Sequence, residues 1–264
     1  MRPRTRALPD RYGRWAIVVG ASEGLGAAFA SQLAARGMNL VLVARRGHLL
    51  ARLQEELATE HQVEVRCLVG DSADPTVAEA LADAVADLDL GIVIYNAAYT
   101  QVGPFAEAPE EEIERVVDVN VRGPLRVLRT LVPTMCRNRR GAVVLMSSLS
   151  GLQGTPYISV YAASKAFNMI LAEGLWYELR SHGVEVVACC AGAMRTPGYI
   201  KSFNRDVPGM LSPDEAARRT LDGLGGGPRL VPGHLNRLTA LLTGRILPRR
   251  SAVRLIGRNT KHIT

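Results

Sequence analysis

Six short runs of apolar residues recur along the chain, separated by stretches with the spacing of amphipathic helices. Continuous apolar runs of this length are typical of strands that are buried on both faces of a parallel sheet. Strands that alternate with helices form right-handed βαβ units. The sequence therefore predicts an α/β fold, a doubly wound parallel sheet with helices on both faces. The six runs and a possible seventh lie at residues 15–20, 39–44, 63–69, 91–95, 141–146, 184–190 and 230–231.

The length of 264 residues fits one domain of this kind with a large core. We find no internal repeat, low-complexity tract or interdomain linker. We expect a basic N-terminal tail over residues 1–14, a Rossmann-type catalytic domain over 15–233 and a basic C-terminal extension over 234–264. No apolar run approaches the roughly 20 residues that span a bilayer. The apolar stretch near the N-terminus is too short for a signal peptide, so we expect a cytoplasmic protein.

The net charge of +7 is unevenly distributed. Residues 1–14 carry +4, residues 223–264 carry +8 with no acid, and the body between them carries −5. Nucleic-acid-binding domains gather basic charge on a folded face, so we expect no nucleic-acid partner. The C-terminal extension places leucines at helical spacing among arginines. Such a helix lies on an anionic membrane surface or packs on the body or a neighbouring subunit, and the second role is the commoner one.

The four cysteines and five histidines are scattered. No His-Glu-x-x-His pattern or paired-cysteine spacing occurs among them, so no metal site is expected. Cys189 and Cys190 are adjacent in an apolar run, which places their side chains on opposite faces of a strand. We interpret both as buried small apolar residues.

A glycine-rich turn joins the first predicted strand to the first predicted helix, with the spacing Gly-x3-Gly-x-Gly. Glycines let a backbone turn tightly against a pyrophosphate, and the helix N-terminus supplies amide donors and positive potential. The turn therefore predicts a dinucleotide-binding loop. Its candidate residues are Gly20, Ser22, Glu23, Gly24, Leu25 and Gly26.

The second predicted strand ends at Ala44 and is followed by Arg45 and Arg46. An acid near this point suits a free ribose 2′-hydroxyl, whereas an arginine suits a 2′-phosphate. We therefore predict NADP(H) as the cofactor, with Arg45 as its ligand. Glu23 complicates this prediction, because it brings negative charge to the same region.

Tyr161 and Lys165 lie four residues apart, so on a helix they share one face. An ammonium beside a phenol favours the phenolate and lowers the pKa of the tyrosine, which makes it usable as a general acid or base. Only three of the 32 basic residues are lysines. A chain that otherwise uses arginine keeps a compact ammonium at 165, where a planar guanidinium does not substitute.

In these motifs the sequence resembles the single-domain short-chain dehydrogenase/reductase family over about residues 15–197, and within it the reductases that act on keto groups of steroids and acyl chains. Ser148 precedes Tyr161 by thirteen residues, which is the family's spacing. The resemblance implies an NADP(H)-dependent oxidoreductase that acts on a small-molecule carbonyl or alcohol. The residues that carry it are Gly20, Gly24, Gly26, Asp71, Asn96, Asn120, Ser148, Tyr161 and Lys165.

The resemblance also implies catalytic roles. Tyr161 would give a proton to the substrate carbonyl oxygen or remove one from an alcohol. Lys165 would hold the nicotinamide ribose and lower the pKa of Tyr161. Ser148 would orient the substrate oxygen, and Asn120 would hold a water that links Lys165 to solvent.

Further cofactor contacts are implied for residues outside the glycine-rich turn. Asp71 would contact the adenine, and Asn96 with Ala97 would line the cleft between adenosine and nicotinamide. Thr196 would contact the cofactor at the start of a substrate lid over residues 193–212. Tyr95 stands where the family has asparagine, and we expect this change either to narrow the cleft or to alter the stiffness of the loop.

The lid carries apolar side chains beside glycines, which predicts a mobile cover over an apolar ketone. An ordinary loop that buries these side chains is the alternative. The predicted helix after Tyr161 is apolar on more than one face, which indicates a homodimer or homotetramer contact or a helix buried in the monomer. A non-enzymatic NADP-binding sensor or scaffold is the alternative function. A nucleotide-sugar epimerase needs a larger substrate domain than this length provides.

Overall fold

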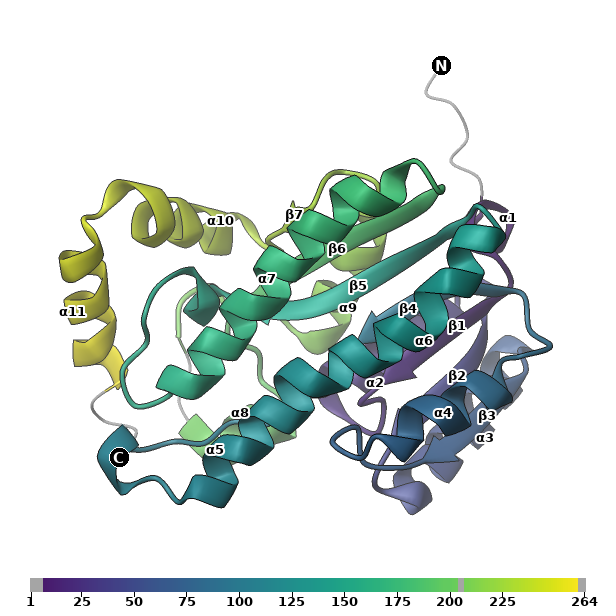
Figure 1. Ribbon diagram of the computed structural model, residues 1–264, viewed down its shortest axis with the longest axis horizontal. Helices are drawn as coiled ribbons and strands as arrows, with labels where there is room; N and C mark the ends of the chain where they lie inside the picture. Colours follow the sequence, from purple (N-terminus) through teal and green to yellow (C-terminus); the bar gives the residue numbers. More distant parts are fainter. Residues whose placement is uncertain (1–6, 204–206, 261–264) are drawn as a thin grey trace.

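The computed structural model describes residues 7–203 and 207–260, and its centre is one parallel sheet (Figure 1). The strand order is β3-β2-β1-β4-β5-β6-β7, which reverses direction between β1 and β4 as in a doubly wound fold. The α/β prediction is confirmed. The strands are β1 (Trp15–Val19), β2 (Asn39–Ala44), β3 (Val65–Val69), β4 (Leu90–Tyr95), β5 (Gly141–Ser148), β6 (Val184–Ala191) and β7 (Arg229–Leu230).

The central strands are buried along their whole length. Every residue of β1 and β4 is buried, and Ile17 of β1 stands in register with Val41 of β2 and Val93 of β4. Burial on both faces removes the alternation of polar and apolar residues, which is why these strands are continuous apolar runs.

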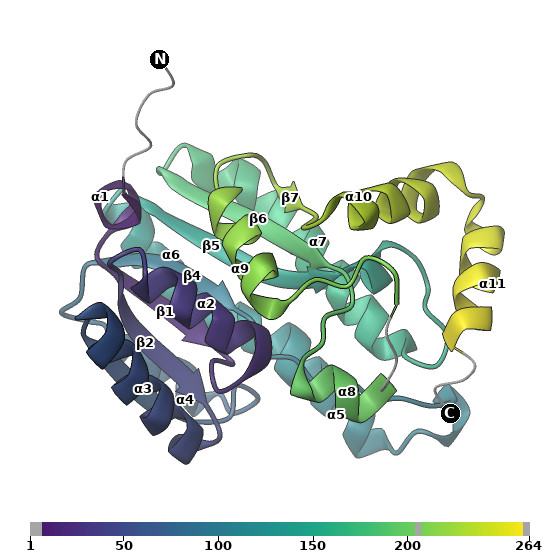
Figure 2. The same cartoon turned by 180° about the vertical axis from the view of Figure 1, so that it is seen from behind.

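Helices cover both faces of the sheet. One apolar layer contains side chains of α2, α3 and α9, and the other contains side chains of α4, α6 and α7. Figure 1 shows α6 and α7 in front of the sheet, and Figure 2 shows α2 and α9 on the opposite face. The helices are α1 (Leu8–Tyr12), α2 (Gly24–Ala34), α3 (Gly47–His61), α4 (Thr76–Ala84), α5 (Glu110–Val117), α6 (Gly123–Arg137), α7 (Ser159–Arg180), α8 (Pro197–Phe203), α9 (Pro213–Asp222), α10 (His234–Leu241) and α11 (Arg249–Thr260).

A wide π-helical turn, Asp118–Arg122, joins α5 to α6. The Tyr95 hydroxyl donates to the carbonyl oxygen of Val119 in this turn at 2.6 Å. A side chain at Gly123 would come within 2.1 Å of that hydroxyl, so glycine at 123 lets the tyrosine approach. Tyr95 therefore points into the helix layer and does not narrow the nucleotide cleft as expected.

The N-terminal segment is partly folded rather than a tail over its whole length. Residues 8–12 form α1, and Tyr12 is buried. The Tyr12 hydroxyl and the Arg11 guanidinium donate to the two carboxylate oxygens of Glu185 at 2.7 and 2.6 Å. These contacts fix α1 beside β6, and residues 1–6 lie outside the described part of the chain.

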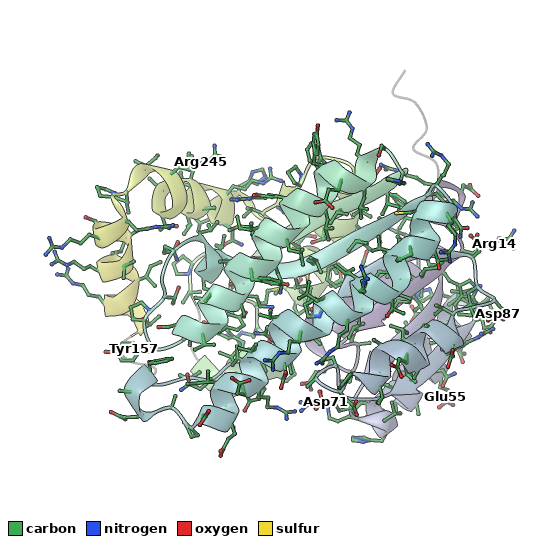
Figure 3. The ribbon with its side chains drawn as sticks, in the orientation of Figure 1. Arg14, Glu55, Asp71, Asp87, Tyr157 and Arg245 are labelled. Atoms are coloured by element: carbon green, nitrogen blue, oxygen red, sulfur yellow. The ribbon has the colours of Figure 1, made fainter. Side chains whose placement is uncertain are left out.

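The C-terminal extension comprises α10, a π-helical turn (Leu242–Ile246) and α11, and it lies at one end of the molecule (Figure 1). Arg249 donates to the carbonyl oxygen of Leu152, and the buried Asn236 donates to that of Pro232. Its outer side exposes both charged and apolar residues, and Arg245 in Figure 3 is an example of the charged ones. The exposed large apolar residues of the extension are Leu235, Leu238, Leu241, Leu242, Ile246 and Leu255.

One side of the extension thus packs on the body, and the other side is exposed to solvent. The choice between a membrane surface and a subunit neighbour for that side stays a prediction. In residues 7–203 and 207–260, no helix has both the length and the apolar character needed to cross a bilayer.

Candidate active site

The structure brings Tyr161 and Lys165 together on the face of α7 that packs against β5 and β6. The Lys165 Nζ lies 5.4 Å from the centre of the Tyr161 ring and donates to the carbonyl oxygen of Met146 at 3.0 Å. Lys165 is 3% exposed. Burial of a lysine is rare unless the ammonium is hydrogen-bonded, and here the strand β5 supplies the acceptor.

The pKa of Tyr161 differs from the sequence-based expectation. Burial raises the pKa of the Tyr161 phenol to about 12, and the Ser148 hydroxyl only partly offsets this by lowering it. The expected lowering by Lys165 is therefore wrong for this arrangement. Desolvation disfavours the phenolate more than the neighbouring groups favour it. A phenol with this pKa is protonated at neutral pH and is a weaker acid than a solvated tyrosine.

Burial lowers the pKa of Lys165 to about 8. A buried ammonium loses hydration that one carbonyl acceptor does not replace, so the neutral amine is favoured. The Lys165 side chain therefore exchanges its proton near physiological pH, unlike a solvated lysine with a pKa near 10.4.

Ser148 ends β5 and begins the short turn Leu149–Leu152. Its hydroxyl oxygen accepts from the Ser150 amide at 3.2 Å and from the Ser150 hydroxyl at 2.9 Å. The turn packs closely on α7, since a side chain at Gly151 would come within 2.7 Å of the Ala166 amide nitrogen. Ser148 thus caps a turn and also lies close enough to Tyr161 to influence its pKa.

Asn120 lies in the π-helical turn and is completely buried. Its Nδ2 donates to the Ser164 hydroxyl and to the Tyr99 carbonyl oxygen, both at 2.9 Å, and its Oδ1 accepts from the Tyr99 amide at 2.8 Å. The Ser164 hydroxyl donates to the carbonyl oxygen of Tyr161 at 2.7 Å. A chain of hydrogen bonds therefore connects Asn120 to the backbone of α7 at Tyr161.

The glycine-rich loop has the geometry of a phosphate cradle. Helix α2 begins at Gly24 (φ +58°), and no side chain caps its first turn, so its amides are available to an anion. A side chain at Gly26 would come within 1.9 Å of the Gly20 carbonyl oxygen, which requires glycine at 26. Asn96 Nδ2 donates to that same oxygen at 2.9 Å and ties the loop to the end of β4.

Two further predicted cofactor residues lie against this loop. The Ala97 amide donates to Val19 at 2.8 Å, and a side chain at Gly20 would come within 2.6 Å of the Ala97 nitrogen. A side chain at Gly24 would come within 3.1 Å of Thr196, so the start of the predicted lid lies beside the loop. Leu25 is buried in the core, which leaves only its backbone to face a ligand.

The two arginines after β2 differ in their contacts. Arg46, which the prediction omitted, forms an ion pair with Glu23 at 2.8 Å and donates to the Ser22 hydroxyl at 2.9 Å. Arg45 lies 3.7 Å from a carboxylate oxygen of Asp71. The negative charge of Glu23 is thus matched by Arg46, and Arg45 remains mostly exposed at the rim of the loop.

Asp71 follows β3 and is labelled in Figure 3. Its carboxylate accepts from Arg115 at 2.8 Å and from the Ala73 amide at 3.1 Å. The predicted adenine contact therefore shares its carboxylate with α5, a partner that sequence spacing does not reveal.

Three loops follow the carboxyl ends of β4, β5 and β6, and the third begins the predicted lid. The Gly103 amide donates to the Tyr157 carbonyl oxygen at 2.8 Å, which joins the loop after β4 to the loop before α7. Tyr157 (Figure 3) adopts φ +66°, a strained value for a tyrosine that is typical of functional loops. A bridge between Met194 and Leu211 closes the base of the lid, of which residues 204–206 lie outside the described range. Ile200 on α8 is exposed.

Comparison with known proteins agrees with this arrangement. The family model for short chain dehydrogenase matches residues 14–206. A 7beta-hydroxysteroid dehydrogenase of Clostridium sardiniense is 34% identical over 86% of this chain and 88% of its own length. A very-long-chain 3-oxoacyl-CoA reductase of Aspergillus clavatus is 42% identical over 76% of this chain but only 61% of its own length.

A solved structure supports the fold as well. A short-chain dehydrogenase from Sphingobium yanoikuyae in complex with NADPH superimposes with a TM-score of 0.79 at 32% identity, covering 88% of this chain and 93% of that one. The chain therefore belongs to the short-chain dehydrogenase family, and it is an oxidoreductase. The predicted family membership is confirmed.

The sequence analysis missed three residues that the structure brings to the site, and each had a signal. Arg46 neighbours the predicted Arg45. Ser164 and Asn168 follow Tyr161 and Lys165 by three residues, which places them on the same side of α7, and both are buried.

Proposed function

We propose that the protein is an NADP(H)-dependent oxidoreductase that interconverts a ketone and a secondary alcohol on a small apolar substrate. One observation carries the proposal. Three groups lie together near the carboxyl end of β5: the Tyr161 phenol, the Ser148 hydroxyl and the buried Lys165 ammonium. The uncapped N-terminus of α2 belongs to the same edge of the sheet. This edge is where doubly wound folds bind their ligands.

The residues of the phosphate loop fit a dinucleotide. Amides of the first turn of α2 and the glycine backbone would hold the pyrophosphate, and Thr196 would border it. A bound nicotinamide cofactor supplies or accepts the hydride. The choice of NADP(H) rests on Arg45 and Arg46, because guanidinium groups suit a 2′-phosphate. The NADPH complex of the Sphingobium yanoikuyae relative supports this choice.

The protein's own groups perform the proton transfer. Tyr161 is protonated at neutral pH and would donate its phenolic proton to the substrate oxygen during reduction. Ser148 would donate a hydrogen bond to the same oxygen and fix its position. Lys165 would stabilise the phenolate that forms, since its ammonium lies beside the Tyr161 ring.

The substrate class follows from the two relatives and the loops. Both named relatives act on a keto or hydroxyl group of an apolar skeleton, one a steroid and one a long acyl chain. The loops around the catalytic face of this chain carry Tyr157, Ile200 and Met210 beside glycines. We propose a steroid or acyl ketone as the substrate, with the lid over residues 193–212 as its cover.

The test is turnover of NADPH against steroid ketones and 3-oxoacyl thioesters, compared with NADH under the same conditions. We expect reduction of at least one of these ketones and a clear preference for NADPH. Ser148→Ala should lower kcat while leaving NADPH binding unchanged, because the serine faces the substrate oxygen. Absence of reduction with every ketone, in protein that binds NADPH, would favour the non-enzymatic sensor instead.

A subunit contact through α7 is part of the proposal. Ile170 and Tyr177 lie on this helix and are 58% and 79% exposed, although both are large and largely apolar. Surfaces of this kind commonly mark protein contacts. Light scattering of the purified protein should show a dimer or tetramer, and a monomer at all concentrations would contradict the contact.

A further inference from the structure

In the π-helical turn that contains Asn120, two successive backbone carbonyl oxygens accept hydrogen bonds from side chains. Tyr95 donates to the Val119 carbonyl oxygen at 2.6 Å, and Asn168 Nδ2 donates to the Asn120 carbonyl oxygen at 3.0 Å. π-Helical turns are uncommon and often occur at functional sites. Both carbonyls are therefore held by residues from outside the turn, one from β4 and one from α7.

Asn168 lies on the catalytic face of α7. It follows Tyr161 by seven residues and Lys165 by three, so the three side chains form one stripe along the helix. Asn168 is 1% exposed. Its carboxamide is thus buried, on the same side of α7 as Lys165 and in contact with Asn120.

The orientation of the Asn168 carboxamide is determined by its partner. The Asn120 carbonyl is an acceptor, so the nitrogen of Asn168 must face it and Oδ1 must face away. Among residues 7–203 and 207–260, no group donates a hydrogen bond to this buried Oδ1. A buried acceptor without a donor costs about 1–3 kcal/mol, so such atoms in native proteins are normally paired, and a buried water is a common partner.

We propose that Asn168 is a positioning residue of the proton relay, in which its Nδ2 fixes the Asn120 carbonyl and its Oδ1 accepts from a water that serves Lys165. The inference rests on the proposed function. The Nδ2 group holds the Asn120 carbonyl, and the unpaired Oδ1 is the acceptor that seats the water. In the described part of the chain Tyr95 has no unpaired buried acceptor, and it only holds the turn.

The proton balance of the relay is simple. Tyr161 gives its proton to the substrate oxygen and becomes a phenolate. The Lys165 ammonium returns a proton to the phenolate and becomes an amine, which the lowered pKa of Lys165 permits. The seated water gives a proton to the amine and regains one from solvent, so one proton from solvent is consumed for each ketone reduced.

Asn168→Leu tests the inference, because leucine fills a similar volume without hydrogen-bonding groups. We expect kcat for ketone reduction to fall about tenfold, a part of the 10²–10⁴ that general acid catalysis contributes. The solvent deuterium isotope effect on kcat should increase, because reprotonation becomes slower. The substrate KM and the Kd for NADPH, measured by fluorescence titration without turnover, should stay within about twofold.

Tyr95→Phe is the matched control. It also removes a donor to a carbonyl of the same turn, but it leaves the proposed water acceptor, Asn168 Oδ1, in place. It should lower the melting temperature as Asn168→Leu does, with kcat and isotope effect unchanged. Asn168→Gln, which keeps both the amide donor and the oxygen acceptor, should retain the wild-type isotope effect more closely than Asn168→Leu does. If Asn168→Leu fails to fold, the smaller Asn168→Ala, which also lacks hydrogen-bonding groups, replaces it with the same expectations.

Two results would overturn the inference while leaving the proposed function intact. One is a wild-type kcat and isotope effect in Asn168→Leu. The other is an equal loss of kcat in Asn168→Leu and Tyr95→Phe, which would mean that both residues only stabilise the turn. Inactivity of the wild-type protein toward all ketones contradicts the proposed function itself.

Discussion

The catalytic face of α7 and the C-terminal extension are opposites in composition and burial. On α7, polar groups such as Lys165 and Asn168 are buried, and the Lys165 Nζ and the Asn168 Nδ2 each donate to a backbone carbonyl. In the extension, large apolar residues such as Leu238 and Ile246 are 51% and 59% exposed. A buried polar group costs stability and is retained for chemistry, whereas an exposed apolar group indicates a surface that a partner covers.

The comparison predicts that substitutions in the two regions have opposite consequences. Those on the catalytic face should change activity strongly, and some should increase stability. Those on the outer side of the extension should change neither the activity nor the stability of the isolated protein. The following predictions test this contrast, from the largest expected effect to the smallest.

Lys165→Met should abolish ketone reduction and yet stabilise the fold. Burial lowers the pKa of Lys165 from 10.5 to about 8. At about 1.4 kcal/mol per pKa unit the charged lysine costs about 3 kcal/mol at pH 7, and the lost hydrogen bond to Met146 returns about 1 kcal/mol. Denaturant unfolding should therefore show a gain of about 2 kcal/mol, and a less stable variant at pH 7 would contradict the assignment.

The pH dependence of the same pair follows from the lowered pKa. Between pH 8 and 10.5 the unfolded chain holds a proton on Lys165 that the folded protein has lost, so wild-type stability rises with pH in this window relative to Lys165→Met. The advantage of the variant should be full below pH 8 and vanish by about pH 10.5. In the wild type, kcat for reduction should decline above pH 8 as the ammonium loses its proton. A constant stability difference across this range would show that Lys165 is not desolvated.

Arg46→Ala should weaken NADPH binding about 10–100-fold, the range expected for a charged hydrogen bond to a phosphate of about 1.5–3 kcal/mol. NADH lacks the 2′-phosphate, so its affinity should not change. Arg45→Ala is the matched variant, and comparison of the two by fluorescence titration shows which guanidinium contacts the phosphate. Equal losses for NADPH and NADH in both variants would instead mean that these arginines only support the loop.

Tyr95→Phe and Leu238→Ser compare the interior of the body with the surface of the extension. Removal of the Tyr95 hydroxyl leaves the buried Val119 carbonyl without its donor and should cost about 1–3 kcal/mol. Leu238→Ser changes an exposed position and should alter the free energy of unfolding by less than about 0.5 kcal/mol. A large loss in Leu238→Ser would show that the extension is covered by the same chain or by a second copy.

The outer side of the extension can be tested directly on lipid. Full-length protein and a Leu238→Ser, Leu242→Ser double variant should be sedimented with anionic and with neutral vesicles. A membrane contact predicts binding to anionic vesicles that the double variant reduces. Equal sedimentation of both proteins would leave a subunit neighbour as the explanation, which light scattering of the double variant would then reveal as a change of oligomeric state.

The strands and the site motifs could be predicted because their signals are local. The continuous apolar runs identified β1, β2 and β4 almost to the residue, and the spacing of Tyr161 and Lys165 followed from helix geometry. The Gly-x3-Gly-x-Gly spacing also predicted the glycine-rich loop, in which the position of Gly26 has no room for a side chain.

The remaining features depend on contacts between distant segments. The pKa of Tyr161 could not be predicted, because burial outweighs the neighbouring charge and burial is known only from the fold. Arg46 pairs with Glu23, which lies 23 positions away in the sequence. Asn168 donates to the Asn120 carbonyl, which lies 48 positions away. The folding of residues 8–12 depends on Glu185, which lies 173 positions from Tyr12.

The central claim is that the Tyr161 phenol delivers the proton to the substrate oxygen. Single-turnover oxidation of NADPH with an accepted ketone tests it in Tyr161→Phe, which keeps the ring and loses only the hydroxyl. The account predicts a rate at least about 10²-fold below wild type with NADPH affinity unchanged. A wild-type rate of hydride transfer in Tyr161→Phe would contradict it.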